Sequence, residues 1–392
     1  MTEVERQAAD SLRRYLRDVG FAQIYKYVVG SSLYAVHPAV IGSTTAANIT
    51  EFFDEVLAED PSVTLLRALM GDEAVAWDRL DPAQRQTAGD LLAAGFLAEA
   101  DGRIGPSRYQ LISAFGRNLL IDRRIHFGGG VHEVYIGFDS YAMLNYVDPG
   151  TLKGTGKALD LCTGSGVAAL YLSLFCQHTV ATDIGTAPLA LSRFNRRLNG
   201  CEDGIEIRDQ PLDRTLTSGE RFDVLTCNPP FVAYPPDLRA TLYSQGTDLD
   251  GQGYMRDIIE ALPTILTESG SAFIVADLIG NQAGPYFEGE LEAYAARLEL
   301  SIDLYIDNTI EAEVQVPPMS HYLARLNPSF SVEEMADVFR RFQQQTLRAS
   351  HYHMTTMRLT TGAKSPHVRL FRRYALRRPE PVPKWRQILE GA

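Results

Sequence analysis

Short apolar runs alternate with helical segments along the second half of the chain. The runs KALDLC, HTVATD, RFDVLTC and SAFIVADL each end in a polar or glycine-rich turn. Strands that alternate with helices indicate a mainly parallel sheet with helices on both faces. The pattern therefore predicts a doubly wound α/β fold, in which ligands bind at the carboxyl ends of the strands.

The N-terminal part of the chain has a different pattern. ITEFFDEVLAED and SVTLLRALMG carry apolar residues at helical spacing. Asp81 before Pro82 indicates a helix start, and the turn ADGRIG then separates two strand-like runs. A helix followed by a hairpin resembles the end of a winged-helix unit, which can bind nucleic acid, dimerise or cover a substrate. We expect a mostly helical domain over residues 1–130.

The C-terminal part predicts further elements of the second domain, which we expect to cover residues 131–392. SIDLYID indicates a strand, SVEEMADVFRRFQQQTLRA a helix, and HYHMTTMRL and VRLFRRYAL two more strands. The stretch 308–350 is long for a connection, and we expect it to be an insertion before a last antiparallel strand. Within it, VPPMSHY either covers a pocket or turns the chain. FGGGV, between His126 and His132, reads as a plain linker or a hinge.

Composition narrows the possible partners. The formal net charge of −12 argues against a long nucleic-acid footprint. The basic stretch VRLFRRYALRRPEPVPKWRQ is either a solvated surface or a site for an anionic partner. No apolar run approaches the ~18 residues of a membrane span, and the N-terminus lacks an apolar signal core, so we expect a cytoplasmic protein. The four cysteines form no C-x-x-C pair and the histidines show no ligand spacing, so we predict no metal.

Two strand ends carry the first candidate chemistry. In ALDLCTGSGVAAL a strand ends near Asp160, and Gly164 and Gly166 precede a helix that begins near Val167. Glycines let the backbone approach a ligand closely, and the helix start offers free N–H groups. The spacing D-x-x-x-G-x-G differs from G-x-G-x-x-G, so pyrophosphate binding is not favoured. A tight strand–helix turn without a ligand is the structural alternative.

The next strand ends at Asp183, which lies 23 residues after Asp160. This is the length of one strand–helix–strand unit, and a carboxylate at that place can accept both hydroxyls of a ribose. Alternatively, Asp183 caps the helix that follows Ile184.

These two motifs resemble those of the class I S-adenosylmethionine-dependent methyltransferases. LDLCTGSG is similar to the first motif of that family, and ATDIGTAPLALSRFNRRLNG to the second. The resemblance implies a Rossmann-like, mostly parallel seven-stranded sheet and S-adenosyl-L-methionine as cofactor. An acidic residue usually binds the adenine amine after the third strand; Pro211 stands there, so Asp209 or Asp213 is expected to substitute. The implied cofactor-binding residues are Asp160, Cys162, Thr163, Gly164, Gly166, Asp183, Ile184, Asp209 and Asn228.

NPPF, which follows RFDVLTC, contains the residues that we predict to be catalytic. It resembles the [D/N]-P-P-[Y/F] signature of the branch that methylates planar nitrogens, such as glutamine amides and exocyclic base amines. The Asn228 side-chain oxygen and the Pro229 carbonyl can both accept hydrogen bonds from an NH₂ group and favour the charge that it develops. Pro230 fixes the backbone, and Phe231 offers a flat face. A proline-capped strand end is the structural alternative.

Two flanking segments complete the predicted pocket. VYIGFDSYAML resembles the segment before the first motif in the release-factor glutamine methyltransferases, where it forms a pocket wall, and this implies Phe138, Asp139 and Ser140 as lining residues together with Val232. Asp139 and Ser140 could instead cap the helix SYAMLNYV. GTDLDGQGYMRDIIEALPTIL is similar to the acidic, glycine-rich start of the next helix in the same group.

The leading hypothesis is an enzyme that methylates a planar nitrogen, with a protein glutamine favoured because NPPF continues into valine and proline as in the glutamine enzymes. A nucleobase amine in RNA or DNA is the second possibility, and a small metabolite or another use of the cofactor is the third. A non-catalytic S-adenosylmethionine-binding protein is the alternative of a different class, although a scaffold has no need of the acceptor geometry of NPPF.

Overall fold

The computed structural model describes residues 1–28, 52–58, 60–71, 73–123, 136–152, 156–241, 245–363 and 365–372, with the single residues 49 and 134. The FGGGV segment with His126 and His132, and the tail beyond Arg372, lie outside the described residues. Among the described helices, none has the length and apolar character needed to cross a bilayer.

The N-terminal part is built from helices and short antiparallel strands, as the sequence predicts. Its elements are α1 (Glu3–Asp18), α2 (Phe21–Val28), the 3₁₀ turns η1 (Pro61–Val63) and η2 (Trp77–Arg79), α4 (Leu66–Met70), α5 (Pro82–Ala93), β1 (Val75–Ala76), β2 (Leu97–Ala100), β3 (Arg103–Pro106), β4 (Tyr109–Ala114) and β5 (Arg117–Asp122).

Local sequence signals explain where these helices start and how the strands pair. Asp81 caps α5 and forms a reciprocal capping box with Gln84, next to Pro82 in the first turn. The strands β1, β3 and β2 form one small sheet, and β4 and β5 form a separate hairpin. A helix followed by a hairpin is therefore present. That this part acts as a winged-helix unit, by binding nucleic acid, dimerising or covering a substrate, stays a prediction.

The second part is built around one large sheet. Its strands are β6 (Lys157–Leu161), β7 (His178–Asp183), β8 (Ile205–Asp209), β9 (Phe222–Cys227), β10 (Leu266–Asn281), β11 (Gly284–Pro285), β12 (Ser301–Glu311), β13 (His351–Thr360) and β14 (His367–Arg372). Its helices are α6 (Phe138–Tyr146), α7 (Pro149–Leu152), α8 (Val167–Leu172), α9 (Thr186–Leu198), α10 (Leu212–Leu216), α11 (Gly253–Ile265), α12 (Glu288–Leu298), α13 (Ala312–Leu326), α14 (Val332–Arg341) and the π-helix η3 (Phe342–Leu347).

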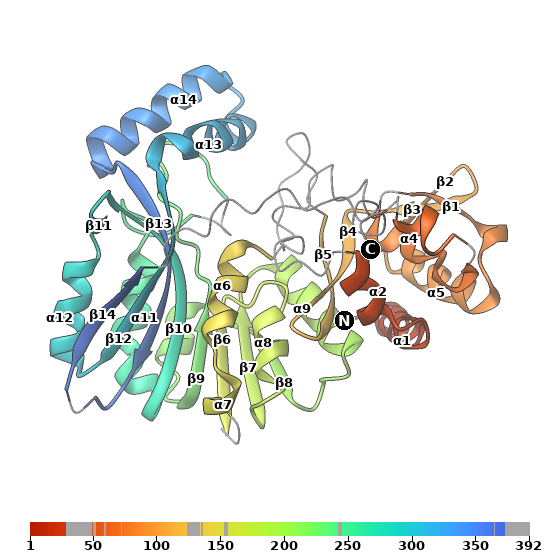
Figure 1. The fold of residues 1–392 in the computed structure, drawn as a ribbon, viewed down its shortest axis with the longest axis horizontal. Helices are drawn as coiled ribbons and strands as arrows, with labels where there is room; N and C mark the ends of the chain where they lie inside the picture. The colour runs from red at the N-terminus through yellow and green to blue at the C-terminus, as the bar shows by residue number, and fades with distance from the viewer. Residues whose placement is uncertain are drawn as a thin grey trace, which may run out of the picture.

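The strand order is β14-β12-β13-β10-β9-β6-β7-β8, with β11 paired to β10 (Figure 1). The strands β8, β7, β6, β9 and β10 run parallel, whereas β13 runs antiparallel to both β10 and β12. The seven runs that the sequence analysis predicts as strands correspond to β6, β7, β9, β10, β12, β13 and β14. The described sheet has nine strands, because it also contains β8, which pairs with β7, and the two-residue β11, which pairs with the end of β10.

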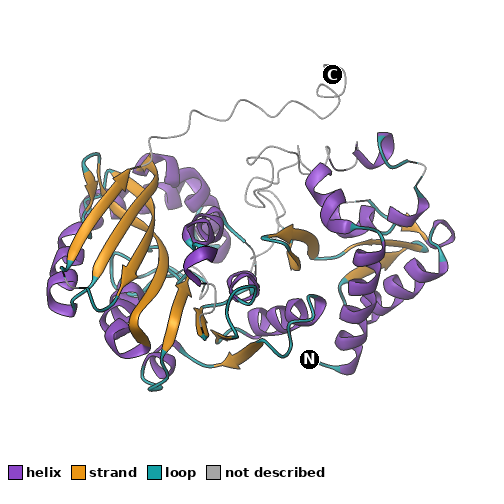
Figure 2. Cartoon of the chain, turned by 60° about the horizontal axis from the view of Figure 1, so that its bottom comes forward, coloured by secondary structure: helices purple, strands orange, loops and turns teal. Residues whose placement is uncertain are grey.

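The apolar residues of the strands fill two separate cores. Ala158 of β6 packs in the cluster that also contains the N-terminal helices, whereas its neighbour Leu159 packs in the cluster with α11 and α12. Successive side chains of a strand point to opposite faces, so this alternation places a helical layer on each side of the sheet, as Figure 2 shows. The N-terminal elements lie beside the β8 edge, against α9 (Figure 1).

The residues between β12 and β13 form a third cluster away from these two layers. α13, α14 and η3 pack on Ala233, Tyr234 and Leu238, which follow the NPPF segment (Figure 1). This contact places α13 next to the carboxyl ends of the strands, where the sequence predicts a ligand.

Two asparagines, Asn195 of α9 and Asn199 at the C-cap of that helix, join the N-terminal part to the sheet. The fully buried Asn195 donates from Nδ2 to the carbonyls of Leu120 and Ser165, and its Oδ1 accepts from the Leu120 N–H. Asn199 exchanges the same pair of bonds with the backbone of Asn118. The side chains of α9 thus complete the free edge of β5, where backbone groups would otherwise be buried without partners.

Replacing Asn195 by alanine should destabilise the whole chain. The substitution leaves three buried backbone groups without a partner, so we expect a loss on the order of 3 kcal/mol in the free energy of unfolding. Asn199→Ala is the matched control and should cost less, because Asn199 is partly exposed and water can replace its bonds. Denaturant unfolding measures both, and equal losses would contradict the proposed role of Asn195.

Candidate functional site

A cavity of about 1230 Å³ opens at the carboxyl ends of the parallel strands. Its walls come from the turns after β6, β7, β8 and β9, from α6, α11 and α13, and from the end of β10. Its volume exceeds the roughly 300–1,000 Å³ of an ordinary small-molecule pocket, so it can hold a cofactor together with an acceptor group.

The glycine loop after β6 forms one wall of this cavity. Cys162, Gly164 and Gly166 all have positive φ angles, of 55°, 53° and 83°. A Cβ on Gly166 would lie 3.3 Å from Cβ of Ser192 on α9, which is a tight contact, and the positive φ would strain any other residue, so glycine suits the entry to α8. Cys162 and Gly164 line the cavity, whereas Gly166 does not.

Asp160 lies beneath this loop rather than in the cavity wall. Its carboxylate accepts hydrogen bonds from Thr163 Oγ1 at 2.5 Å, Thr226 Oγ1 at 2.8 Å and the Ala169 N–H at 3.2 Å. Burial raises its pKa to about 6, although these bonds favour the ionised form. Asp160 and Thr163 thus tie the loop to β9 and to the start of α8, and hold the wall in place.

Asp183 stands in the cavity wall and holds the opposite side of the loop. Its Oδ2 accepts from the Gly164 N–H at 3.0 Å, and its Oδ1 accepts from the Ile184 and Gly185 N–H groups at 2.8 and 2.9 Å. Burial raises its pKa, against the effect of these three bonds. A carboxylate has about four acceptor positions, so one on Oδ2 remains for a ribose hydroxyl. The N-cap of α9 is Gly185, and Asp183 makes no N-cap hydrogen bond to that helix.

The NPPF segment leaves the sheet after Cys227 and turns into the cavity, where all four of its residues form part of the wall. Asn228 Nδ2 donates to Oγ of the buried Ser140 on α6 at 3.1 Å, which leaves Asn228 Oδ1 as the acceptor atom of the side chain. The Pro229 carbonyl accepts no hydrogen bond from the described residues. The turn therefore contains two oxygen atoms, Asn228 Oδ1 and the Pro229 carbonyl, that accept no hydrogen bond from the described residues.

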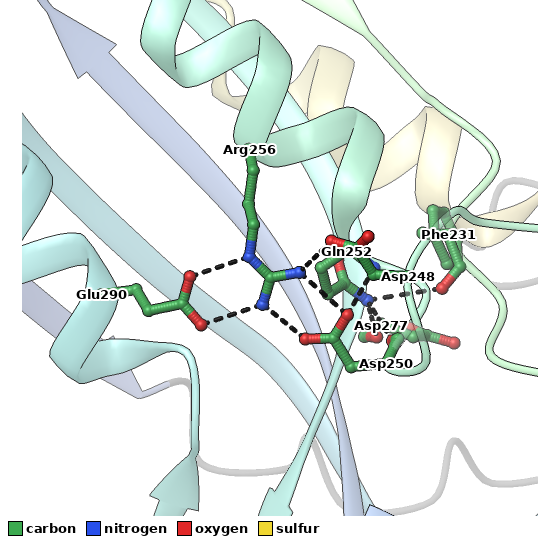
Figure 3. A network of polar contacts seen from close by, with 7 residues as sticks. All are labelled: Phe231, Asp248, Asp250, Gln252, Arg256, Asp277 and Glu290. Carbon is green, nitrogen blue, oxygen red and sulfur yellow. Dashed lines mark hydrogen bonds and ion pairs between the residues drawn. The ribbon is translucent and has the colours of Figure 1, made fainter.

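The segment between β9 and α11 holds this turn in place. Gln252, which is 1% exposed, donates from Nε2 to the carbonyls of Phe231 at 3.3 Å and Asp277 at 3.2 Å (Figure 3). A Cβ on Gly251 would lie 2.3 Å from the Phe231 oxygen, so only glycine allows this approach. The Gly246 N–H donates to the Val232 carbonyl at 3.1 Å.

Arg256 fixes the segment that contains Asp248, Asp250 and Gln252, and this segment in turn positions the NPPF residues (Figure 3). Its guanidinium donates to both carboxylate oxygens of Glu290 at 2.8 and 2.9 Å, and also bonds Asp250 and Asp248. Burial tends to raise the pKa of Asp250, but the bonds from Arg256 and the Gln252 N–H outweigh it and lower that pKa. A bidentate arginine pair fixes direction as well as distance, so α11 and α12 orient the loop.

A further part of the cavity wall, here called the roof, comes from α13 and β13. Gln315 and Met319 of α13 and Met354 of β13 line the cavity there. The sequence analysis allowed VPPMSHY either to cover a pocket or to turn the chain. This segment lies inside α13, with both of its prolines within the helix. It therefore helps to cover the pocket.

The charge of the cavity is one-sided. Its wall carries six carboxylates and, among the residues that the structure describes, no lysine, arginine or histidine; the six are Asp139, Asp183, Asp213, Asp257, Glu260 and Asp277. Such a wall attracts cationic groups and repels phosphates.

The structure brings most of the predicted site residues to one place. Those in the cavity wall are Phe138, Asp139, Cys162, Gly164, Asp183, Ile184, Asn228, Pro229, Pro230, Phe231 and Val232. Asp160, Thr163, Gly166 and Ser140 stand behind it, and Asp209 is exposed at the end of β8 outside it. Asp139 and Ser140 do not cap a helix, because α6 has Gly137 at its N-cap and no side-chain cap bond.

Sequence reasoning missed several wall residues. Gln210 borders the cavity next to Pro211 and Asp213, and its Nε2 donates to Thr215 Oγ1 at 3.0 Å. Asp277 lies within β10, where a carboxylate interrupts the apolar run SAFIVADL, and that interruption is a signal the sequence offered. Gln315 and Met354 carry no local signal.

Residues 140–281 match the methyltransferase small domain. This part of the chain is similar to that family. The match confirms the resemblance to the class I S-adenosylmethionine-dependent methyltransferases, their Rossmann-like fold and S-adenosyl-L-methionine as the cofactor of the domain.

Curated relatives of the methyltransferase domain have stated substrates. A release factor glutamine methyltransferase of Clostridium acetobutylicum is 30% identical over 94 residues, 23% of this chain and 32% of the relative. Ribosomal protein uL3 glutamine methyltransferases of Bordetella pertussis and Bradyrhizobium diazoefficiens are 31% identical over 125 residues and 28% over 214. The first alignment covers 29% of this chain and 41% of the relative, and the second 50% and 64%. The chain thus spans less than two thirds of the length of these relatives.

The residues of the cavity fit the cofactor of the methyltransferase domain. Gly164 leaves bare backbone at the cavity wall, where a side chain would take up space. Asp183 keeps an acceptor position for a ribose hydroxyl, and the carboxylates of the wall suit a molecule with a sulfonium and an ammonium group.

Asp183→Ala should weaken S-adenosylmethionine binding. We expect a loss of about 1–3 kcal/mol in binding free energy, because the ribose loses an acceptor and the Gly164 N–H loses its partner. Isothermal titration calorimetry measures this loss directly. Asp209→Ala is the control, since Asp209 lies outside the cavity wall, and its affinity should stay unchanged. Unchanged affinity in Asp183→Ala would show that this carboxylate only braces the loop.

Proposed function

We propose that this protein transfers a methyl group from S-adenosylmethionine to the side-chain amide nitrogen of a glutamine in a protein. The observation that carries the proposal is the pair of acceptors in the NPPF turn, Asn228 Oδ1 and the Pro229 carbonyl. The names of the curated relatives, which act on glutamines of uL3 and of release factors, support the same acceptor class.

A glutamine amide needs the two oxygens that this turn provides. The amide nitrogen shares its lone pair with the carbonyl group and is a poor nucleophile. Two acceptors can bind both N–H groups, orient the nitrogen and stabilise the positive charge that it gains in the transition state. S-adenosylmethionine, when bound, supplies a methyl group on a positive sulfur. The chain itself binds, orients and shields the reacting groups from water.

The charge of the cavity favours a protein acceptor over a nucleic acid. A wall with six carboxylates, and no cationic side chain among its described residues, repels a phosphate backbone. The roof of α13 and β13 adds apolar surface from Met319 and Met354, which suits the aliphatic part of a side chain. A cytoplasmic location stays a prediction from the sequence.

Two further assignments belong to this proposal. Gln210 takes the place of the acidic residue that was expected to bind the adenine amine. Its Oε1 accepts a hydrogen bond from that amine, because its Nε2 already donates to Thr215 Oγ1. Phe138, which is 47% exposed, and Phe231 form the two aromatic surfaces of the acceptor end. The N-terminal part, residues 1–130 in the predicted division, stays a candidate for substrate or partner binding.

The acceptor class can be decided with labelled cofactor. Purified protein is incubated with methyl-labelled S-adenosylmethionine and, separately, with unmethylated ribosomal protein uL3, a release factor, and total RNA. We expect label in one of the two proteins, and acid hydrolysis should release it as methylamine from methylglutamine. Label in RNA, in small molecules alone, or in nothing would contradict the proposal.

Asn228→Ala should reduce turnover by ~10²-fold or more and leave cofactor affinity within a few-fold, because only the transition state needs the lost acceptor. Ser140→Ala removes only the group that orients the amide, so we expect a smaller loss of about tenfold. Single-turnover rates and calorimetry separate the two effects. A mutant at position 228 with wild-type turnover would remove Asn228 from the reaction.

A further inference from the structure

Asp277 of β10 and Asn228, the first residue after β9, belong to neighbouring parts of the sheet edge. β9 and β10 are parallel, with Cys227, the last residue of β9, aligned to Ile274, so a continuation of β9 by one residue would bring Asn228 level with Val275. Asp277 is two residues further along and therefore points to the same face, about 7 Å farther toward the open end of the sheet. Both side chains form part of the same cavity wall.

The carboxylate of Asp277 has no partner among the described residues. No hydrogen bond or ion pair reaches it, whereas Asp160 accepts three bonds and Asp250 is held by Arg256. An acceptor left free at a cavity wall is available to a ligand, because burying it unbonded costs free energy.

The surroundings of Asp277 disfavour its ionised form. Burial raises its pKa to about 7, and the like charge of Asp139 on α6 adds to the shift. On the adjacent strand β13, Tyr352 is aligned with Ile279, two residues further along β10 than Asp277, and it is a neutral phenol because burial raises the pKa of Tyr352 to about 12. The other packed neighbours, Met354 and Gln252, do not titrate.

The backbone around Asp277 is fixed to the NPPF turn. Gln252 Nε2 donates to the carbonyl oxygens of both Phe231 and Asp277, so one side chain joins the NPPF turn to β10 (Figure 3). The distance between the turn and Asp277 is thus set by a buried side chain, which suits groups that act on one atom.

We propose that Asp277 is a further catalytic residue, whose carboxylate accepts a hydrogen bond from the acceptor amide nitrogen and takes its proton. The inference rests on the proposed function. The nitrogen lone pair forms the new C–N bond, and the electron pair of the broken carbon–sulfur bond stays on sulfur. The N–H bond breaks, its electrons remain on nitrogen, and the proton moves to Asp277, which later releases it to water.

Such a step has a clear physical reason. An amide nitrogen that has gained a carbon becomes strongly acidic, and its positive charge is costly in a partly dehydrated cavity. A carboxylate with a pKa near the working pH can take the proton and then release it. Asn228 and Pro229 orient the nitrogen but cannot accept the proton.

The test compares pH profiles of three proteins. Single-turnover rates are measured from pH 5.5 to 9 with saturating S-adenosylmethionine and whichever of uL3 or the release factor wild type labels. Wild type should rise to a plateau with an inflection at or below about pH 7. Asp277→Asn should be slower by ~10²-fold or more and lack the inflection. Asp139→Asn should keep the inflection and shift it to lower pH, because a like charge is removed.

A second readout needs no acceptor. A carboxyl whose pKa is higher in the folded than in the unfolded protein stabilises the fold below about pH 4, and this contribution is lost as the pH rises through about 7. The melting temperature of Asp277→Asn relative to wild type should therefore rise between pH 4 and 7.

Each outcome decides between the proposals. If wild type methylates an acceptor and Asp277→Asn keeps both its rate and its inflection, the inference fails and the proposed function stands. If Asp277→Asn loses only cofactor affinity, the carboxylate attracts the sulfonium and the inference also fails. A relative melting temperature that does not change with pH contradicts it as well. If wild type labels neither protein, the proposed function fails and the inference fails with it.

Discussion

The carbonyl of Phe231 is the point on which the geometry of the site depends. A turn with two successive prolines cannot join the hydrogen-bonded ladder of a sheet, so something else must hold it. Here Gln252 donates to this carbonyl, and Gly251 packs against it at a distance that no side chain permits. Arg256 fixes that segment because it bonds Asp248 and Asp250 within it and Glu290 of α12. The acceptor oxygens of Asn228 and Pro229 are therefore set before any ligand binds.

The same arrangement explains why the cavity can be so acidic. Asp160 and Asp250 are bonded to hydroxyls, backbone N–H groups or an arginine, and serve the structure. The carboxylates of the wall differ in their partners: Asp183 accepts three backbone bonds and Glu260 pairs with Arg297, whereas Asp277 has no partner among the described residues. Preformed negative groups around developing positive charge need no rearrangement during the reaction. The wall thus serves chemistry on cations and neutral amides rather than on phosphates.

Local patterns predicted the sheet and the positions of the loops because apolar runs that end in glycine or aspartate mark strand ends. Asp183 and NPPF were found in this way. The same pattern assigned Asp160 to the cofactor, but its three bonds to Thr163, Thr226 and Ala169 place it behind the wall. The register of β9 against β10, which sets Asp277 beside Asn228, is not visible in one strand alone. Nor does the sequence show that α13 roofs the cavity or that Asn195 completes the edge of β5, since both are contacts between distant segments.

A crystal structure with S-adenosylhomocysteine and the glutamine peptide of the labelled protein tests the central claim most directly. We expect the acceptor amide nitrogen within about 3 Å of both Asn228 Oδ1 and the Pro229 carbonyl oxygen, with the Asn228 amide still bonded to Ser140 and Gln252 still bonded to Phe231. A nitrogen bound elsewhere in the cavity, or an Asn228 side chain turned so that Nδ2 faces the acceptor, would contradict it.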